Sequence, residues 1–205
     1  MLTRIAVLVS GGGTNLQALL DAEKSGALRS GRIVLVVSNV PGAYALERAK
    51  AAGVETATLT RKELSGQEGF ERALQAALEA RGIELVILAG FMSILSAEFV
   101  KKWPERIINV HPALIPSFCG KGYYGLHVHE AALSYGVKVT GATVHFVNEV
   151  PDGGRIIFQK AVEVLDGDTP ETLQRRVMEQ AEWILLPAAA EKVSAQIAAE
   201  KEKKS

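Results

Sequence analysis

Three polar side chains near predicted strand ends could together catalyse a group transfer. Asn109 and His111 stand two residues apart at the end of an apolar run, so an extended backbone points both to one side. A carboxamide and an imidazole placed this way can stabilise an oxyanion. Asp152 lies in a Pro-Asp-Gly-Gly turn, and beside His111 it would raise the pKa of the imidazole and orient it as a proton donor. The structural alternatives are loop capping for Asn109 and His111 and an ordinary turn aspartate for Asp152.

A glycine-rich turn at residues 10–15, Ser-Gly-Gly-Gly-Thr-Asn, follows the first apolar run. Glycines let the backbone approach a ligand closely, and the amides and dipole of the following helix favour an anion. Leu16 replaces a glycine of the dinucleotide fingerprint, and the second predicted strand ends in Ser38 and Asn39 rather than in an acid. The turn therefore favours a phosphorylated metabolite over NAD or ATP. The alternative is a tight turn that needs glycine only for its conformation.

Metal chemistry is not expected. His127, His129, His145 and Cys119 lack the spacing of a zinc site, and the first two face opposite sides of a predicted helix. A nucleophilic Cys119 would need an adjacent base and an acidified thiol, which the sequence does not show. We interpret Cys119 as a small loop residue.

The elements that must position these residues alternate between strand and helix. Uninterrupted apolar runs predict strands that are covered on both faces. These runs lie at residues 5–9, 33–37, 85–88 and 107–110, with a weaker candidate at 54–59. Segments with helical spacing lie between them, at residues 15–24, 44–52, 68–81 and 96–102. Such alternation predicts right-handed crossovers and a parallel sheet, whose strands bind ligands at their carboxyl ends.

The second half of the chain has a different pattern. Residues 111–124 predict a long loop, which in a compact domain is usually functional or mobile. A helix at 127–134 then precedes strands at 139–147 and 156–164, and the remainder from Thr169 is helical with a kink at Pro187. We expect an α/β fold built on one open, mostly parallel, twisted sheet of about seven strands, with helices on both faces.

The composition indicates a globular protein. The chain has 205 residues, of which 48% are hydrophobic and 22% charged, so it needs neither disulfides nor metal to fold. We expect a single domain over residues 1–205, with a phosphate-binding half at about 1–105, a folate-binding and catalytic half at about 106–190 and a solvated charged tail at 200–205.

Charge and hydropathy argue against nucleic acid and membrane as binding partners. Lys plus Arg (23) balance Asp plus Glu (23), so no global field would attract nucleic acid or anionic lipid. No apolar run reaches the roughly 20 residues of a membrane helix, and no signal core precedes the first predicted strand. We expect a cytoplasmic protein that contacts neither membrane nor nucleic acid.

Five segments in order resemble the phosphoribosylglycinamide formyltransferases, a folate-dependent family. They are the turn ending in Gly13, Thr14 and Asn15, LAGFMSILS at 88–96, INVHPALIP at 108–116, GLHVH at 125–129, and TVHFV at 143–147 with Asp-Gly-Gly at 152–154. The resemblance implies formyl transfer from 10-formyltetrahydrofolate to the amino group of 5-phosphoribosylglycinamide, in purine biosynthesis. It implies small-molecule substrates, no metal, and a monomer or homodimer.

The resemblance also implies site residues. Asn109, His111 and Asp152 would be catalytic, with Asp152 assisting an oxyanion held by the other two. Gly13, Thr14 and Asn15 would hold the substrate phosphate and ribose, and Glu182 on the last long helix would contact the ribose. The positions implied for folate binding are Leu88, Met92, Ser93, Ile94, Leu95, Phe99, Val100, Asn148, Glu149, Val150 and Pro151.

Three features depart from the family pattern. Arg155 stands where relatives have Pro or Gln, and Gln67 stands where some have an arginine near the folate tail. Residues 119–124 look like an insertion, with Lys121 between two glycines. This insertion is either a mobile basic flap over the phosphate or a harmless longer loop.

Three other functions remain as alternatives. A methionyl-transfer-RNA formyltransferase shares the Asn, His and Asp chemistry but is expected to carry a nucleic-acid-binding domain. A formyltetrahydrofolate hydrolase is usually preceded by a regulatory domain, whereas the first predicted strand begins at about Arg4. A non-catalytic folate- or phosphate-binding module would be expected to lose catalytic residues, and all three are present.

Overall fold

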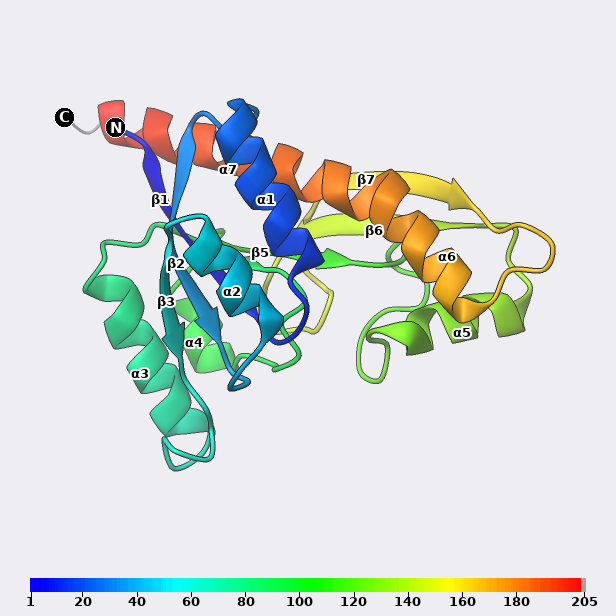
Figure 1. Ribbon diagram of the computed structural model, residues 1–205, viewed down its shortest axis with the longest axis horizontal. Coiled ribbons are helices and arrows are strands. Elements are labelled where there is room, and N and C mark those ends of the chain that lie inside the picture. Colours follow the sequence, from blue (N-terminus) through cyan, green and yellow to red (C-terminus); the bar gives the residue numbers. More distant parts are fainter. Residues whose placement is uncertain (204–205) are drawn as a thin grey trace.

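The computed structural model describes residues 1–203 and contains one sheet of seven strands (Figure 1). The strands are β1 (Thr3–Val9), β2 (Gly31–Ser38), β3 (Glu55–Thr58), β4 (Leu85–Leu88), β5 (Ile107–His111), β6 (Val139–Phe146) and β7 (Ile156–Glu163). The helices are α1 (Thr14–Ser25), α2 (Tyr44–Ala51), α3 (Gln67–Glu79), α4 (Ala97–Lys101), α5 (Leu126–Tyr135), α6 (Pro170–Val177) and α7 (Trp183–Glu202), with a π-helix, η1 (Met178–Glu182), between the last two.

The sheet confirms the predicted fold class. Its strand order is β3-β2-β1-β4-β5-β6-β7, and the first five of these strands run parallel. β6 then pairs antiparallel with β5, and β7 pairs antiparallel with β6. Figure 1 shows α5 and α6 beside these last two strands, at the end of the molecule away from α3. The sheet is therefore open and mostly parallel, as the alternating apolar runs predict.

Two hydrophobic cores cover the two faces of the sheet. β1 contributes Ile5, Val7 and Val9 to a core with α1, α2 and α7. The alternate residues Ala6 and Leu8 face the other core, with α3 and α4. Because successive side chains of a strand point to opposite faces, a strand buried on both sides needs a continuous apolar run. This requirement explains why the strands of the first half could be predicted from hydropathy.

The strand order places a ligand crevice at the carboxyl ends of β1, β4 and β5. Connections leave β1 toward β2 on one side and reach β4 on the other, which makes this point the topological switch of the sheet. The glycine turn follows β1, residues 89–95 follow β4, and Asn109 and His111 end β5. The three sequence motifs of interest therefore share one edge of the sheet.

The last helical segment differs from its expected form. Pro187 lies within α7, whereas the departure from α-helical geometry comes earlier, in the π-helix. Residues 200–202, expected in a solvated charged tail, complete α7 instead, and the remaining tail residues 204 and 205 lie outside the described part. None of the helices described between residues 1 and 203 combines the length and apolar character needed to span a bilayer.

Candidate active site

The three predicted catalytic side chains meet in one cavity of about 840 Å³. Asn109 and His111 line it from the carboxyl end of β5, and Asp152 lines it from the turn between β6 and β7. The Oδ2 atom of Asp152 lies 3.7 Å from Nδ1 of His111. Both side chains are largely buried, with 14% and 5% of their side-chain surfaces exposed. The alternative that these residues are unrelated loop caps and turn residues does not fit this convergence.

A second histidine, His145, joins the group and orients the carboxamide. In the β5–β6 register Asn109 lies directly opposite His145, so the two side chains share a face of the sheet. The Nδ1 atom of His145 lies 2.8 Å from the carbonyl oxygen of Phe146 and must donate to it. Its Nε2 atom can then accept a hydrogen bond from the Asn109 amide nitrogen, 3.3 Å away. One amide hydrogen of Asn109 is thereby held in place and the other stays available to a ligand.

Burial strongly affects the charge states of the predicted catalytic residues His111 and Asp152. Loss of solvent lowers the pKa of His111 below its ordinary value, although the charge of Asp152 and the Phe118 carbonyl act in the opposite direction. The expectation of a raised pKa for His111 is therefore wrong, because desolvation outweighs the carboxylate. Burial would raise the pKa of Asp152, but its contacts with His145, with His111 and with the amide of Gly120 outweigh burial and lower that pKa. At neutral pH the resting pair is a carboxylate beside a neutral imidazole.

The loop at residues 117–125 binds both members of this pair. The carbonyl oxygen of Phe118 lies 2.8 Å from Nε2 of His111, and the amide of Gly120 donates to Oδ2 of Asp152 over 2.8 Å. Phe118 has a positive φ of 48°, and its ring packs edge-on against Tyr135 of α5 with centroids 6.0 Å apart. Strained backbone of this kind is concentrated at functional sites. The predicted loop is thus part of the site, and its hydrogen bonds to the catalytic pair were not predicted.

In the glycine turn, Gly13 is tightly packed, whereas Gly11 and Gly12 are open to the cavity. Gly13 adopts a φ of 74°, and a Cβ there would lie 2.6 Å from that of Ala45, so this position requires glycine for conformation and space. A Cβ at Gly11 or Gly12 would meet no atom within 4 Å, and both residues line the cavity. The turn leads directly into α1, whose first amides have no helical partners. An anion can therefore approach the backbone here.

Glu182 reaches the glycine turn from the far end of the chain. The Nδ2 atom of Asn15 donates to Oε2 of Glu182 over 2.6 Å, and both residues line the cavity. Burial raises the pKa of Glu182 to about 6, with the Asn15 hydrogen bond acting against this shift. Thr14 also lines the cavity and contacts the sulfur of Met178 at 3.9 Å. The π-helix that contains Met178 and Glu182 thus forms one wall of the predicted phosphate and ribose site.

Most residues assigned to folate binding line the same cavity. They are Leu88, Met92, Ser93, Ile94 and Leu95 after β4, and Asn148, Glu149 and Pro151 before Asp152. Phe99 and Val100 do not line it, because both belong to α4 and are buried in the core against which this helix packs. Val150 is 57% exposed and also lies outside the cavity lining. These three residues therefore find no support as folate contacts.

Comparison with known proteins places this geometry in a family. A model of the family described as formyl transferase matches residues 3–189. The chain belongs to the formyl transferase family. It is 41% identical over 176 residues to phosphoribosylglycinamide formyltransferase of Escherichia coli (strain K12), covering 86% of this chain and 80% of that protein.

Two further similar proteins support the same family assignment. The crystal structure of phosphoribosylglycinamide formyltransferase from Brucella melitensis superposes with a TM-score of 0.87 at 41% identity, covering 95% of this chain and 97% of that one. The trifunctional purine biosynthetic protein adenosine-3 of Gallus gallus is 48% identical over 191 residues, or 93% of this chain. The chain spans only 18% of that larger protein.

A polar network links the glycine turn to the segment after β4. The hydroxyl of Ser10 donates to Oδ1 of Asn39 over 2.6 Å and accepts from the amide of Met92 at 2.8 Å. The amide nitrogen of Asn39 donates in turn to the hydroxyl of Ser93 over 2.7 Å. In the sequence, Asn39 serves only as evidence against a dinucleotide site. Its position directly after β2 was the one sequence signal that could have placed it near the glycine turn.

His129, which the sequence offers only as a candidate metal ligand, lines the active-site cavity from α5. The side chain is fully buried, and neither ring nitrogen has a hydrogen-bond partner among residues 1–203. Burial, with a contribution from His111, lowers the pKa of His129 to about 4, so this imidazole is neutral. His127 points outward and contacts Glu130 at 2.9 Å, as the predicted helix indicates.

Gln67 and Arg155, two residues that depart from the family pattern, both contact other residues near the cavity. Gln67 donates to the carbonyl oxygen of Ile94 over 3.1 Å, beside the predicted folate wall. Arg155 pairs with Glu105 at 2.8 Å and lies over the ring of Phe146 at 4.7 Å. Through these two contacts, Arg155 stabilises the base of the Asp152 turn from outside the cavity.

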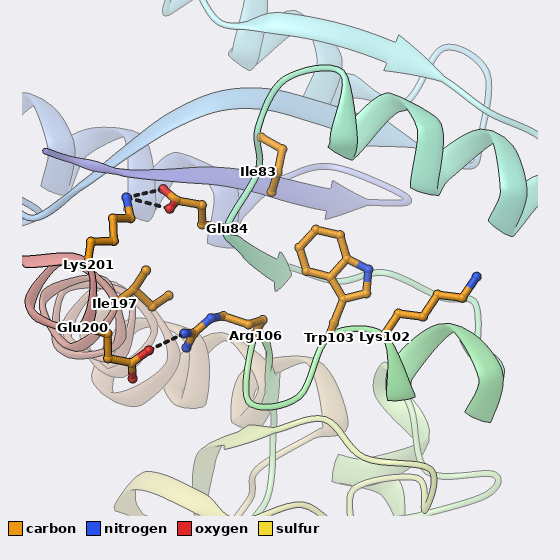
Figure 2. A pocket seen from close by; sticks show the side chains of 8 residues that line it. All are labelled: Ile83, Glu84, Lys102, Trp103, Arg106, Ile197, Glu200 and Lys201. Atoms are coloured by element: carbon orange, nitrogen blue, oxygen red, sulfur yellow. Dashed lines mark hydrogen bonds and ion pairs between the residues drawn. The ribbon is translucent and has the colours of Figure 1, made fainter. Parts of the chain in front are cut away.

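A smaller cavity of about 320 Å³ lies at the amino ends of β4 and β5 (Figure 2). Two ion pairs flank it, Lys201 with Glu84 and Arg106 with Glu200, both at 2.6 Å. Figure 2 shows these pairs tying the end of α7 to the starts of the two strands. The cavity contains none of the predicted catalytic residues and lies at the edge of the sheet opposite to the active site.

Proposed function

We propose that this chain transfers a formyl group from 10-formyltetrahydrofolate to the amino group of 5-phosphoribosylglycinamide, in purine biosynthesis. The observation that carries the proposal is the convergence of Asn109, His111 and Asp152 in a cavity shared with the glycine turn. The relatives named phosphoribosylglycinamide formyltransferase support it, at 41% identity over most of both chains.

The cavity offers each substrate a chemically suitable wall. The open backbone at Gly11 and Gly12, with Gly13, Thr14 and Asn15 at the start of α1, suits a phosphate. Glu182 is placed by Asn15 to accept from ribose hydroxyls. The apolar side chains of Met92, Ile94 and Leu95 suit a pteridine and its linked ring. Residues Asn148, Glu149 and Pro151 complete that part of the cavity. No step of this transfer needs a metal.

The protein groups act by holding protons and negative charge. As the amine attacks the formyl carbon, the carbonyl oxygen becomes an oxyanion that can accept a hydrogen bond from the free amide hydrogen of Asn109. The developing negative charge raises the pKa of His111, which takes up a proton from solvent as the oxyanion forms and releases it when the oxyanion collapses to the product carbonyl. Asp152 orients His111 and, through a water, passes the proton lost by the amine to the departing folate nitrogen.

The decisive experiment mixes purified protein with the formyl donor and phosphoribosylglycinamide and follows folate absorbance. Amine-dependent deformylation supports transfer, loss without amine supports a hydrolase, and no loss supports a binding module. Asn109→Ala should then lower kcat by about a hundred- to a thousandfold, as removing one oxyanion donor commonly does. Asp152→Asn should be similarly impaired, with melting temperatures near wild type, and near-normal turnover in either variant would refute these roles.

We further infer that residues 1–203 work as one formyltransferase domain, because a single sheet carries the phosphate, folate and catalytic residues. We place this activity in the cytoplasm and in a monomer or homodimer. Sedimentation of the purified chain tests the oligomeric state.

A further inference from the structure

The segment after β4 that forms the predicted folate wall, residues 90–95, receives little support from the sheet. The amide of Ala89 donates to the carbonyl oxygen of Leu8 in β1 over 2.9 Å. Beyond this bond, residues 90–95 make no backbone hydrogen bond to β1 in the part of the chain that the structure describes. Met92 and Ile94, at the centre of the segment, are 56% and 66% exposed, so burial does not fix them either.

The glycine turn, which forms the predicted phosphate wall, is an open loop as well. Gly11, Gly12 and Thr14 in this turn are exposed. Transfer requires the two walls to keep a fixed separation, because reacting groups must lie about 3–3.5 Å apart with their orbitals aligned. Two exposed loops that hold two substrates therefore need a rigid link between them.

The side chain of Asn39 forms such a link. Its Oδ1 atom accepts from the hydroxyl of Ser10, at the start of the glycine turn, over 2.6 Å. Its Nδ2 atom donates to the hydroxyl of Ser93, in the folate wall, over 2.7 Å. The Ser10 oxygen also accepts from the amide of Met92 at 2.8 Å. One carboxamide is thus bonded to both walls, and it orients the serine that contacts the folate wall directly.

Asn39 stands on a rigid part of the molecule and outside the cavity. It directly follows β2, which lies between β1 and β3 in the sheet, and Val37 and Ser38 at the end of this strand are fully buried. Among the described residues, neither Asn39 nor Ser10 lines the active-site cavity. A side chain on a rigid element that touches both walls but not the cavity is placed to position other groups rather than to contact a substrate.

We propose that Asn39 is a positioning residue that fixes the predicted folate wall relative to the predicted phosphate wall, so that the formyl group and the attacking amine are aligned. This inference rests on the proposed function. A carboxamide suits the position because it accepts a hydrogen bond at one end and donates at the other. Leucine has a similar size and can do neither.

The test separates alignment from binding. Asn39→Leu should lower kcat by about ten- to a hundredfold, as expected when two reacting groups are displaced by about 1 Å. Calorimetry with each substrate alone should show dissociation constants close to those of the wild type, because Asn39 contacts neither substrate. The kinetics are measured well below the melting temperature of the variant, so that a loss of stability alone would leave kcat unchanged.

Gln75→Leu is the matched control. The Gln75 amide also bridges two side chains, since it accepts from Nε1 of Trp103 at 2.9 Å and donates to Glu79 over 2.6 Å. None of these three residues is among the described residues that line the active-site cavity. Gln75→Leu should therefore leave kcat unchanged.

Ser10→Ala removes the same link from its other end. It should lower kcat in the same way as Asn39→Leu, and the double variant should be no worse than the more impaired single variant, because residues of one hydrogen-bond network are not additive. Fully additive losses would contradict a shared link. An unchanged kcat in Asn39→Leu, or a raised dissociation constant with an unchanged kcat, would overturn the inference.

Hydrogen–deuterium exchange tests the link without any transfer. Residues 90–95 should exchange faster in Asn39→Leu than in the wild type, and at the wild-type rate in Gln75→Leu. If the wild type transfers no formyl group but shows this difference, the proposed function fails and Asn39 still positions the wall. If the wild type transfers the group and exchange at residues 90–95 is the same in Asn39→Leu, the inference fails alone.

Discussion

Replacing Glu182 by glutamine should change how stability depends on pH. Glu182 is 6% exposed and burial raises its pKa from 4.5 to about 6, while Asn15 supplies a hydrogen bond. One pKa unit corresponds to about 1.36 kcal/mol, so ionised Glu182 costs the native state about 2 kcal/mol relative to its protonated form. Glutamine keeps the shape and a carbonyl acceptor for Asn15 but cannot ionise.

The direction of this pH dependence follows from the difference in proton binding between the native and unfolded states. Between the two pKa values the native protein binds more protons at this site than the unfolded chain, so stability falls as pH rises. The contribution of Glu182 is fully present below its unfolded pKa of 4.5 and is lost as pH rises through about 6. The difference in unfolding free energy, wild type minus Glu182→Gln, should therefore be about 2 kcal/mol more favourable to the wild type at pH 4.5 than at pH 8.

Urea denaturation at intervals across this pH range, followed by tryptophan fluorescence, measures the difference. Subtracting the variant from the wild type cancels the titration of the other carboxylates. Glu179→Gln removes an exposed carboxylate from the same π-helix and serves as the control. A difference between wild type and Glu182→Gln that does not vary with pH would refute the argument that burial sets the charge of this residue.

Three further predictions concern the backbone around the site. Gly154→Ala should lower the free energy of unfolding by about 1–3 kcal/mol in urea titrations, because the new Cβ would lie 1.7 Å from the carbonyl oxygen of Phe146. Gly120→Ala should lower kcat more than Gly122→Ala. Both have positive φ, 86° and 94°, and room for a Cβ, but only the amide of Gly120 holds Asp152; equal effects would contradict a role for that bond. Deleting residues 119–124 should raise the KM for the phosphorylated amine if the segment covers the phosphate, and an unchanged KM would remove the flap hypothesis.

The sequence predicted what depends on local pattern. The runs that became β1, β2 and β4 are apolar throughout, and the run of β5 is apolar except for Asn109, because both faces are covered; such runs are visible without a structure. The two-residue spacing of Asn109 and His111 predicted that they share a side, and both line the cavity. The glycine turn after β1 was likewise predicted at the crevice from fold rules.

The features that the sequence could not predict depend on the pairing register of the strands and on burial. The role of His145 follows from its position opposite Asn109, and a pairing register between distant strands is not encoded in either strand alone. The pKa of His111 was predicted in the wrong direction because a neighbouring carboxylate is visible in the sequence, whereas the loss of solvent is not. The resemblance implied that Glu182 and Asn15 serve the same phosphate and ribose site, but the hydrogen bond between them depends on a π-helix that no propensity scale signals.

The resting arrangement of His111 bears on how the site can act. Its Nε2 atom is bound to the Phe118 carbonyl and its Nδ1 atom faces Asp152, so neither nitrogen is free to reach a formyl oxygen. Donation to an oxyanion therefore requires that one of these contacts be exchanged for the substrate. The Phe118 carbonyl is the contact to give up, because an oxyanion accepts hydrogen bonds more strongly than a neutral carbonyl, whereas Asp152 stabilises the protonated imidazole that results. In the proposed mechanism, the loop at residues 117–125 holds the histidine only until the reacting group outcompetes it, so the mechanism depends on backbone atoms that no side-chain motif reveals.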